Sequence, residues 1–428
     1  MFSADNELRG TLPTELSFMT TLDFLDIKRN KIAGSIPDSF QKLTKLNFLD
    51  LRFNSLIGKL PDWFGSALSK LTVCALTGNE LTGEIPISLG QATLLKTLAL
   101  EGNRFDGEMQ MINALSNLEY LYLDDNMLSG RMNDTFLANL GALVHLDISG
   151  NLLTGNLPAH LFQRKSLTIL DVHNNKIGGS IPEFVAENTA LSFLSLYHNS
   201  LTGSVPASIE NLKSLAHLDL TSNKLNGTIT QAIGSLQNLT YLFLSSNNFE
   251  PAAIPSYDFF SGLTKLRELS LGQARRDGEI PNWLGNLSSL ILLDLSSNHL
   301  SGTIPETLWE LTNLRYLLLN RNRFNGTISP KVSQLTDLTM FLLDKNKFIG
   351  DLTDFCSKSR SINFLSADCV PGSVEITCPC CKLCCQDRNK TCNDDILFAN
   401  FDPSWEHNYT RISYSFSPNI LYETNAGN

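Results

Sequence analysis

The chain has 428 residues, of which 42% are hydrophobic and 18% charged, and this composition excludes an intrinsically disordered protein. Its 33 Lys and Arg residues against 43 Asp and Glu residues give a formal net charge of -10, with no long run of either sign. The clustered basic surface that nucleic-acid-binding proteins need is therefore excluded.

A repeat of 24 residues runs through most of the chain. Its first part follows L-x-x-L-x-L-x-x-N, and its second part follows L-x-G-x-I-P-x-x-L-x-x-L, as in Leu81 to Pro86 and Leu300 to Pro305. Fourteen units follow a half unit around Asn6 to Pro13. The residues at the last position of the first part are Asn30, Asn54, Asn79, Asn103, Asn126, Asn151, Asn175, Asn199, Asn223, Asn247, Ala274, Asn298, Asn322 and Asn346.

The alternating Leu positions predict a short strand with one buried face, and a unit this small buries that face only when neighbouring units stack on it. The repeat therefore predicts an α/β solenoid with one long parallel sheet on its concave side. An Asn brought inside must find partners, because an unsatisfied buried amide costs about 1–3 kcal/mol. We expect each Asn to bind the backbone of the adjoining turn, and we expect the solenoid to span residues 1–355.

These motifs resemble the plant-type class of leucine-rich repeats, found in receptor-kinase ectodomains, receptor-like proteins and polygalacturonase-inhibiting proteins. The resemblance covers about residues 5 to 352. It implies a right-handed superhelix whose concave or lateral face binds a ligand. It does not identify that ligand, because a fold does not fix a function.

Two features depart from the repeat. The chain begins inside a unit, with Met1 to Asn6, and lacks both a cap and the basic start and apolar run of a signal peptide. We interpret this as a truncation that removed the signal peptide and the N-terminal cap. The second departure is a 27-residue step from Asn247 to Ala274, where residues 250–261 replace the L-x-G-x-I-P part. It is either a binding loop or an insertion tolerated on the convex surface, and we favour the insertion.

A cysteine-rich segment follows the last repeat, and we expect residues 356–428 to form a C-terminal cap with an aromatic tail that packs on the solenoid. Its even and dense cysteine content predicts a disulfide-rich extracellular cap, without assigning any pairing. The alternative is zinc, because the run contains C-x-x-C spacing, although no His lies near it. The cap looks like that of secreted leucine-rich-repeat proteins from stramenopile algae such as diatoms. Its cysteines are Cys356, Cys369, Cys378, Cys380, Cys381, Cys384, Cys385 and Cys392.

The remaining cysteine, Cys74, occupies a buried Leu position of its strand, and we expect an inert core thiol there. N-x-S/T motifs support an extracellular location, either secreted, in a cell wall or as the ectodomain of a membrane protein. None of them falls on an outward-facing strand position, so glycans would leave the concave sheet bare. The glycosylation candidates are Asn133, Asn226, Asn238, Asn286, Asn325, Asn389 and Asn408.

The residues between the Leu positions face the concave side, and in units five to ten they are rich in aromatic and polar types. Such residues favour binding hot spots, although Tyr and Phe are also ordinary strand residues. His residues from four successive units are expected to titrate near the unperturbed pKa of about 6.5. We expect no metal there, because strands about 4.8 Å apart spread the rings. A basic edge at Lys28, Arg29 and Arg52 is expected to be solvated surface charge. The candidate ligand-binding residues are Tyr120, Tyr122, Asp124, His145, Asp171, His173, Phe193, Tyr197, His198, His217, Tyr241 and Phe243.

The sequence favours a non-catalytic recognition module that binds a protein, peptide or glycan, with a co-receptor or a second copy as further partners. Catalytic signatures such as G-x-S-x-G, H-E-x-x-H and the Walker loop are absent from the sequence, and we expect no cofactor, no nucleic acid and no direct membrane insertion. One alternative is an inhibitor of a secreted polysaccharide hydrolase, which rests on the resemblance. A minor alternative is an ice- or mineral-binding scaffold, because Thr recurs beside the L-x-G turns, but charged residues interrupt that stripe.

Overall fold

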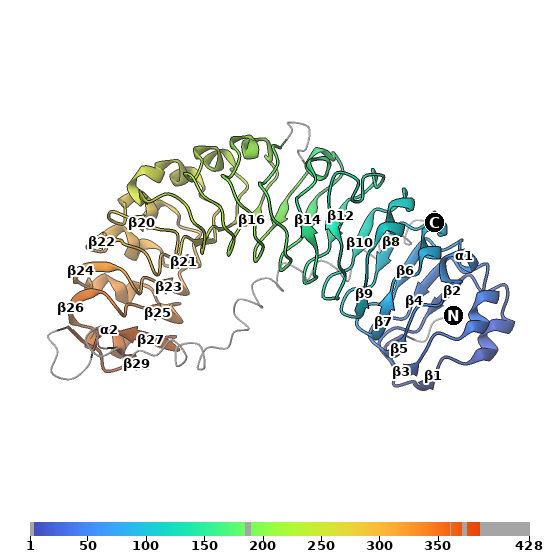
Figure 1. Ribbon diagram of the computed structural model, residues 1–428. Coiled ribbons are helices and arrows are strands. Elements are labelled where there is room, and N and C mark those ends of the chain that lie inside the picture. The colour runs from blue at the N-terminus through green and yellow to red at the C-terminus, as the bar shows by residue number, and fades with distance from the viewer. Residues whose placement is uncertain (1–3, 185–189, 360, 370–374, 386–428) are drawn as a thin grey trace.

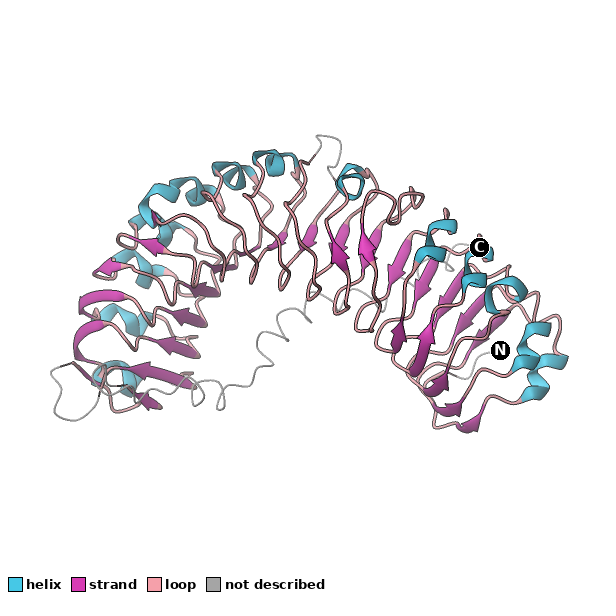
Figure 2. Ribbon diagram, viewed as in Figure 1, coloured by secondary structure: helices cyan, strands magenta, loops and turns pink. Residues whose placement is uncertain are grey.

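The computed structural model describes residues 4–184, 190–359, 361–369 and 375–385, which form an arc (Figure 1). A parallel sheet of 16 strands, the main sheet, lines the concave side, and short helices line the convex side (Figure 2). In spatial order its strands are β2 (Phe24–Asp26), β4 (Phe48–Asp50), β6 (Val73–Ala75), β8 (Thr97–Ala99), β10 (Tyr120–Tyr122), β12 (His145–Asp147), β14 (Ile169–Asp171), β15 (Phe193–Ser195), β16 (His217–Asp219), β17 (Tyr241–Phe243), β19 (Glu268–Ser270), β21 (Leu292–Asp294), β23 (Tyr316–Leu318), β25 (Met340–Leu342), β27 (Phe364–Ala367) and β29 (Leu383–Cys384).

Smaller parallel sheets run along one flank of the arc, where each unit turns from the main sheet towards the convex side. They contain β1 (Arg9–Thr11), β3 (Lys31–Gly34), β5 (Ser55–Gly58), β7 (Glu80–Glu84) and β9 (Arg104–Asp106); β11 (Arg131–Met132) and β13 (Thr154–Gly155); β18 (Ala252–Ala253) and β20 (Arg276–Asp277); and β22 (Ser301–Gly302), β24 (Arg323–Thr327), β26 (Lys347–Asp351) and β28 (Ile376–Thr377).

The convex side carries one short helix in most units, usually 3₁₀, which in most of them begins directly after the Pro of the repeat. These helices are η1 (Thr14–Phe18), η2 (Asp38–Lys42), α1 (Phe64–Ala67), η3 (Ile87–Gln91), η4 (Gln110–Ala114), η5 (Ala159–Gln163), η6 (Ala207–Asn211), η7 (Gln231–Ser235), η8 (Ile254–Gly262), η9 (Asn282–Asn286), η10 (Glu306–Glu310), η11 (Pro330–Gln334) and α2 (Thr353–Lys358).

The core lies between the main sheet and the helices. The middle residue of each strand, usually Leu, faces inward and pairs in register with its neighbour, as Leu146, Leu170 and Leu194 do on β12, β14 and β15. All three are buried, together with the other Leu positions of the repeat, in a single continuous apolar cluster. The expected solenoid with a continuous apolar core is therefore confirmed.

The Asn column forms a hydrogen-bonded ladder along the core. Asn223 is representative: its Nδ2 donates to the carbonyl oxygens of Leu220 and Thr221 in its own turn and of Leu196 in the preceding turn, 3.0 Å away. Its Oδ1 accepts from the backbone N–H of Leu201, also at 3.0 Å. Each amide therefore joins two units through their backbones. At the C-terminal end Asp368 continues the pattern, because its carboxylate accepts from the backbone N–H groups of Lys345 and Asn346.

The irregular unit around Ala274 has lost the ladder amide, and a buried arginine partly replaces it. The guanidinium of Arg276 donates to the carbonyl oxygens of Ala274 in its own turn and of Glu250 in the preceding turn. It also lies over the ring of Tyr257, 5.5 Å from the ring centroid. The extra residues of this unit lie in β18 and η8, on the flank and convex side, so the insertion leaves the concave strands β17 and β19 in register.

The Gly of the L-x-G motif is required where neighbouring turns approach closely. Gly155 has φ +90°, and a Cβ built there would lie 2.2 Å from the carbonyl oxygen of Met132 in the preceding unit. No other residue type fits this position without moving the backbone.

The cysteine-rich segment extends the solenoid, because its strands β27 and β29 pair with the main sheet. The expected boundary between residues 355 and 356 falls within α2. Disulfides join Cys356 to Cys380, Cys369 to Cys384 and Cys378 to Cys381, and Cys385 is disulfide-bonded as well. The expected disulfides are thus confirmed for these seven residues. Cys392 and the aromatic tail from 393 to 428 lie outside the described residues.

Asn223→Ala is expected to lower the free energy of unfolding by about 3 kcal/mol, because it leaves buried N–H and C=O groups of two turns without partners. Asn117→Ala is the control, since exposed Asn117 makes a single hydrogen bond, to the carbonyl oxygen of Thr93. Denaturant unfolding followed by circular dichroism measures both variants. Equal stability of the two would contradict the role given to the ladder.

Replacing both Cys356 and Cys380 by Ala is expected to lower the free energy of unfolding by about 3 kcal/mol, because the disulfide closes a loop of 24 residues. A reductant should lower the melting temperature of the wild-type protein, whereas EDTA should not. Destabilisation by EDTA would favour the zinc interpretation of this segment instead.

Candidate functional site

The candidate ligand-binding residues lie in three columns on the main sheet, because alternate residues of each strand face the concave side and successive strands pair in register. His198 lies at the turn that follows the third column, with φ +50°. By column the candidates are Tyr120, His145, Phe193, His217 and Tyr241 in the first; Tyr122, Asp171 and Phe243 in the second; and Asp124, His173 and Tyr197 in the third.

Rings of neighbouring strands stack along these columns. Phe193 and His217 stack in the first column with centroids 4.2 Å apart, and His173 and Tyr197 do so in the third column at the same distance. Tyr122 lies against His145, and its hydroxyl is 3.4 Å from Nδ1 of that ring. The structure therefore brings side chains of six successive strands, β10 to β17, into one continuous strip.

Stacking buries several side chains that were expected to be exposed. Tyr122, His145, Asp171 and His217 are buried, although all four lie on the concave side. The expected exposure was wrong for these four residues. It was inferred from the alternation of inward and outward side chains within one strand, whereas side chains on adjacent strands cover one another. His173, Phe193, Tyr197 and Tyr241 are half-buried, as are Tyr120, Asp124 and Phe243, and His198 is exposed.

His145, His173 and His217 depart from the expected pKa of about 6.5. Burial lowers the pKa of His145 and of His217 to about 4. Burial also opposes protonation of His173, but the carboxylate of Asp171, whose Oδ1 lies 2.6 Å from Nδ1, outweighs it and raises the pKa. The expectation of an unperturbed pKa was therefore wrong for these three histidines, because burial shifts two of them and a carboxylate shifts the third.

Several carboxyl groups on the concave face have a raised pKa. Burial raises the pKa of Asp147 to about 8 and that of Asp219 to about 6, although both accept hydrogen bonds from the residue two positions later. Burial raises the pKa of Glu101 to about 7 and holds that of Asp124 well above its usual value. The concave face therefore gains negative charge gradually across the neutral pH range.

Sequence reasoning missed Glu268 and Ser195. Glu268 occupies the first column beside Tyr241, is buried, and has a pKa raised to about 8 by burial. It lies just beyond the units that were singled out for their aromatic content. Ser195 is buried between Asp171 and Asp219, and a small serine in a column of acids gives no distinctive sequence signal.

The basic residues of the first units are mostly not solvated. The Lys28 ammonium lies 3.2 Å from Asp26, and the Arg52 guanidinium lies 2.7 Å from Asp50, with both basic side chains buried. Only Arg29 is exposed, as expected for all three, and it pairs with Asp5 at 3.4 Å. The expectation failed for Lys28 and Arg52 because acids of the second column lie beside them.

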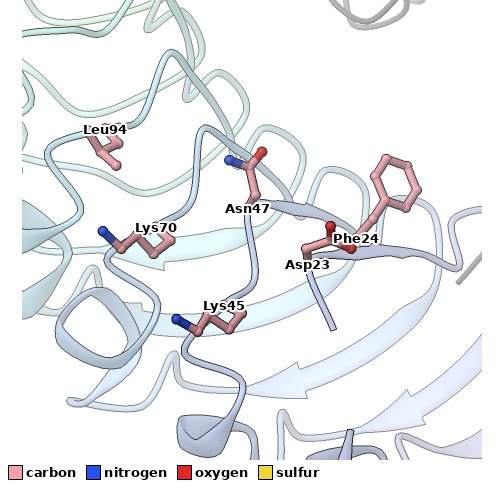
Figure 3. Close-up of a pocket in the computed structure, with 6 residues that line it drawn as sticks. All are labelled: Asp23, Phe24, Lys45, Asn47, Lys70 and Leu94. Carbon is pink, nitrogen blue, oxygen red and sulfur yellow. The ribbon is translucent and has the colours of Figure 1, made fainter. Parts of the chain in front are cut away.

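A shallow hollow of about 410 Å³ lies beside the first strands of the main sheet. Figure 3 shows that its two lysine side chains point to the same side, with Asn47 nearby. Both lysines are exposed, so holding them around a ligand costs side-chain entropy. This hollow is therefore a weaker candidate than the central strip. Its lining residues are Asp23, Phe24, Lys45, Asn47, Lys70 and Leu94.

Within the described ranges, the group of His, Cys, Asp or Glu side chains close enough to share an ion consists of Cys356, Cys378 and Cys380, all of which are in disulfides. Cys74 is a buried free thiol whose pKa burial raises to about 12, in agreement with an inert core residue. Among the described helices, none has the length and apolar character needed to cross a bilayer.

The glycosylation motifs lie away from the concave strip. Five of the seven asparagines are described, all five are exposed, and none lies in a strand of the main sheet. These five are Asn133, Asn226, Asn238, Asn286 and Asn325. Asn389 and Asn408 lie outside the described residues.

Family models described as leucine-rich repeats match residues 165–225, 189–249 and 281–324, and residues 21–43, 45–67 and 142–163. A stretch of 96 residues, 22% of the chain, is 29% identical to the receptor-like protein EIX2 of Solanum lycopersicum and covers 9% of that protein.

Solved receptor structures are similar over most of the chain. The TDR receptor is 32% identical with a TM-score of 0.77, over 84% of this chain and 62% of that one. The plant peptide hormone receptor RGFR1 in complex with RGF2 is 30% identical with a TM-score of 0.75, over 84% and 61%. The Arabidopsis receptor kinase HAESA, in complex with the peptide hormone IDA and the co-receptor SERK1, is 29% identical with a TM-score of 0.69, over 85% and 69%. The chain thus spans less than two thirds of the first two receptor structures and about a tenth of the tomato protein.

Glu268→Gln is expected to stabilise the protein increasingly as the pH rises from about 5 to 8. The folded wild type keeps a proton that the unfolded chain releases near the usual pKa of 4.5, so its stability falls over this window, by at most about 1.4 kcal/mol per pH unit. Glu310→Gln on the exposed convex side is the control. Thermal unfolding between pH 4 and 9 measures the effect, and parallel curves for Glu268→Gln and wild type would refute it.

Proposed function

Since the chain is a plant-type leucine-rich-repeat solenoid similar to the ectodomains of plant receptor-like proteins and receptor kinases, we propose that it is an extracellular, non-catalytic recognition module. It binds a peptide, or a peptide segment of a protein, along the central strip of the concave face between β10 and β17. The observation that carries this proposal is the strip itself: half-buried rings and polar groups form a continuous band across six strands.

The surface chemistry supports peptide recognition. Partly exposed aromatic side chains offer large contact areas at low entropy cost, and they concentrate binding energy when polar groups border them. The strip combines Tyr197 and Tyr241 with carboxyl groups of the second column. The arc offers a span on the order of 30 Å over these strands, at about 4.8 Å per strand, which suits an extended segment of roughly ten residues.

The relatives support the same class of ligand. RGFR1 and HAESA were solved in complexes with a peptide ligand or peptide hormone, and the HAESA complex also contains a co-receptor. For this chain, a peptide ligand and a co-receptor partner are accordingly part of the proposal. Exposed glycosylation motifs away from the main sheet and a concave strip without such motifs fit an extracellular binding protein.

A screen of peptide and glycan arrays with the secreted, glycosylated protein tests the proposal, comparing wild type with a Tyr197→Ala/Tyr241→Ala variant. We expect a peptide ligand whose affinity falls at least tenfold in the variant, because two ring contacts at the centre of the strip are lost. Ile87→Ala is the matched control, since Ile87 is an apolar side chain 85% exposed on the convex side. Peptide binding that persists in the tyrosine variant, or a ligand found only among glycans, would overturn the proposal.

A further inference from the structure

Three side chains of the second column form a short row at the centre of the strip, which we call the acidic floor: Asp171, Ser195 and Asp219. The register pairs Asp171 with Ser195 across β14 and β15, and Ser195 with Asp219 across β15 and β16. The acidic floor therefore belongs to three adjacent strands and runs along the arc.

Stacked rings border the acidic floor on both sides. The pair Phe193 and His217 comes from the first column, two residues before Ser195 and Asp219 on the same strands. The pair His173 and Tyr197 comes from the third column, two residues after Asp171 and Ser195. Because the three columns lie side by side on one face, the acidic floor lies between two aromatic walls.

Polar atoms of the acidic floor lack partners. Asp171 is 0% exposed, and while its Oδ1 contacts His173, its Oδ2 has no hydrogen bond. Ser195 is 1% exposed, and its Oγ has no hydrogen bond. Nδ1 of His217, in one wall, is also unsatisfied. An unsatisfied buried polar atom costs about 1–3 kcal/mol. A ligand group that donates hydrogen bonds to these atoms removes that cost, which makes its binding more favourable.

We propose that the acidic floor is the subsite for a cationic group of the ligand: a Lys or Arg side chain, or an N-terminal ammonium. The inference rests on the proposed recognition function and specifies the chemistry of the ligand. An ammonium offers three N–H donors and a guanidinium five, which match a row of carboxylate and hydroxyl oxygens. The faces of aromatic walls attract the same charge. An anionic group would meet two carboxylates at this position.

The walls cover the acidic floor in the structure, so a side chain reaches it when the rings move apart. His173 and Tyr197 form the half-buried wall on the third column, and rotation of His173 would also free Oδ1 of Asp171. A linear Lys or Arg side chain is narrow enough to pass between rings and to bury its methylene groups against them.

Charge around the subsite makes binding depend on pH. Asp147 and His145 on β12, Asp124 after β10, and His217 on β16 face this region together with Asp219 and His173. A cation favours ionised Asp219, whose pKa is about 6, and neutral His173, whose pKa Asp171 raises. Affinity is therefore expected to fall about tenfold from pH 7 to pH 5 if one proton is taken up.

The test uses the full, glycosylated chain with ¹⁵N-labelled histidine and two tripeptide probes, acetyl-Gly-Arg-Gly-amide and its neutral citrulline counterpart. We expect the arginine probe to shift the imidazole resonances of His173 and His217, and to leave that of exposed His299 in place. Asp171→Asn is expected to weaken this binding at least tenfold. Asp344→Asn is the matched control, because Asp344 is also a buried acid with an unsatisfied Oδ2 but follows β25, outside the strip between β10 and β17.

Equal shifts from the citrulline probe, or arginine binding unchanged in Asp171→Asn, would overturn the cationic subsite. Retained chemical-shift dispersion in both variants shows that they are folded. The array screen separates this outcome from the proposed function. A peptide ligand that binds the strip with neither a basic residue nor a free N-terminal ammonium would refute the cationic subsite alone. If the arginine probe binds at the acidic floor but the arrays yield no peptide ligand, the proposed recognition function is refuted and the cationic subsite is retained.

Discussion

The fold depends on one repeated interaction, the buried side-chain amide that binds the backbone of its own turn and of the turn before. Leucine burial provides most of the stabilising free energy, but apolar contacts persist when one unit shifts its register against the next. The side-chain amide of Asn223, in contrast, satisfies both of its polar atoms in one register only. The ladder therefore fixes which residues lie side by side on the concave face. The irregular unit supports this view, because where the amide is replaced by Ala274, the guanidinium of Arg276 takes over hydrogen bonds to both turns.

Sequence periodicity was sufficient to predict the strands, the inward Leu positions, the Asn ladder and the side of the sheet on which each candidate residue lies. It was insufficient for exposure and titration. Asp171 and His217 lie in the predicted columns, yet they are buried because rings on adjacent strands cover them, which is a property of pairs of units and not of one strand. Lys28 and Arg52 looked like surface charge, because the sequence places Asp26 and Asp50 two residues before them but does not reveal that these ion pairs are buried. Arg276 could not be anticipated, since its role exists only where the repeat fails.

Electrostatics on the concave face follows from the same crowding. Burial raises the pKa of carboxyl groups and lowers that of imidazoles, so the pKa of Asp147 rises to about 8 while that of His145, on the same strand, falls to about 4, which reverses their usual order. His173 escapes this tendency because a carboxylate lies in direct contact with it. The pKa values of the ionisable groups on the concave face are therefore spread over several units. The charge that this face presents to a ligand depends on which groups the rings cover.

Stacking between rings of neighbouring units has a consequence for how such a surface changes during evolution. Solenoids are often regarded as modular, with each repeat exchangeable for another. Here the ring of Tyr197 covers His173 of the preceding unit, and that of Phe193 covers His217 of the following unit, so the surface of a unit is defined by its neighbours. Recombination of single repeats would preserve the fold while altering three surfaces at once, and new specificities should arise more readily from exchange of blocks of adjacent units than from exchange of one.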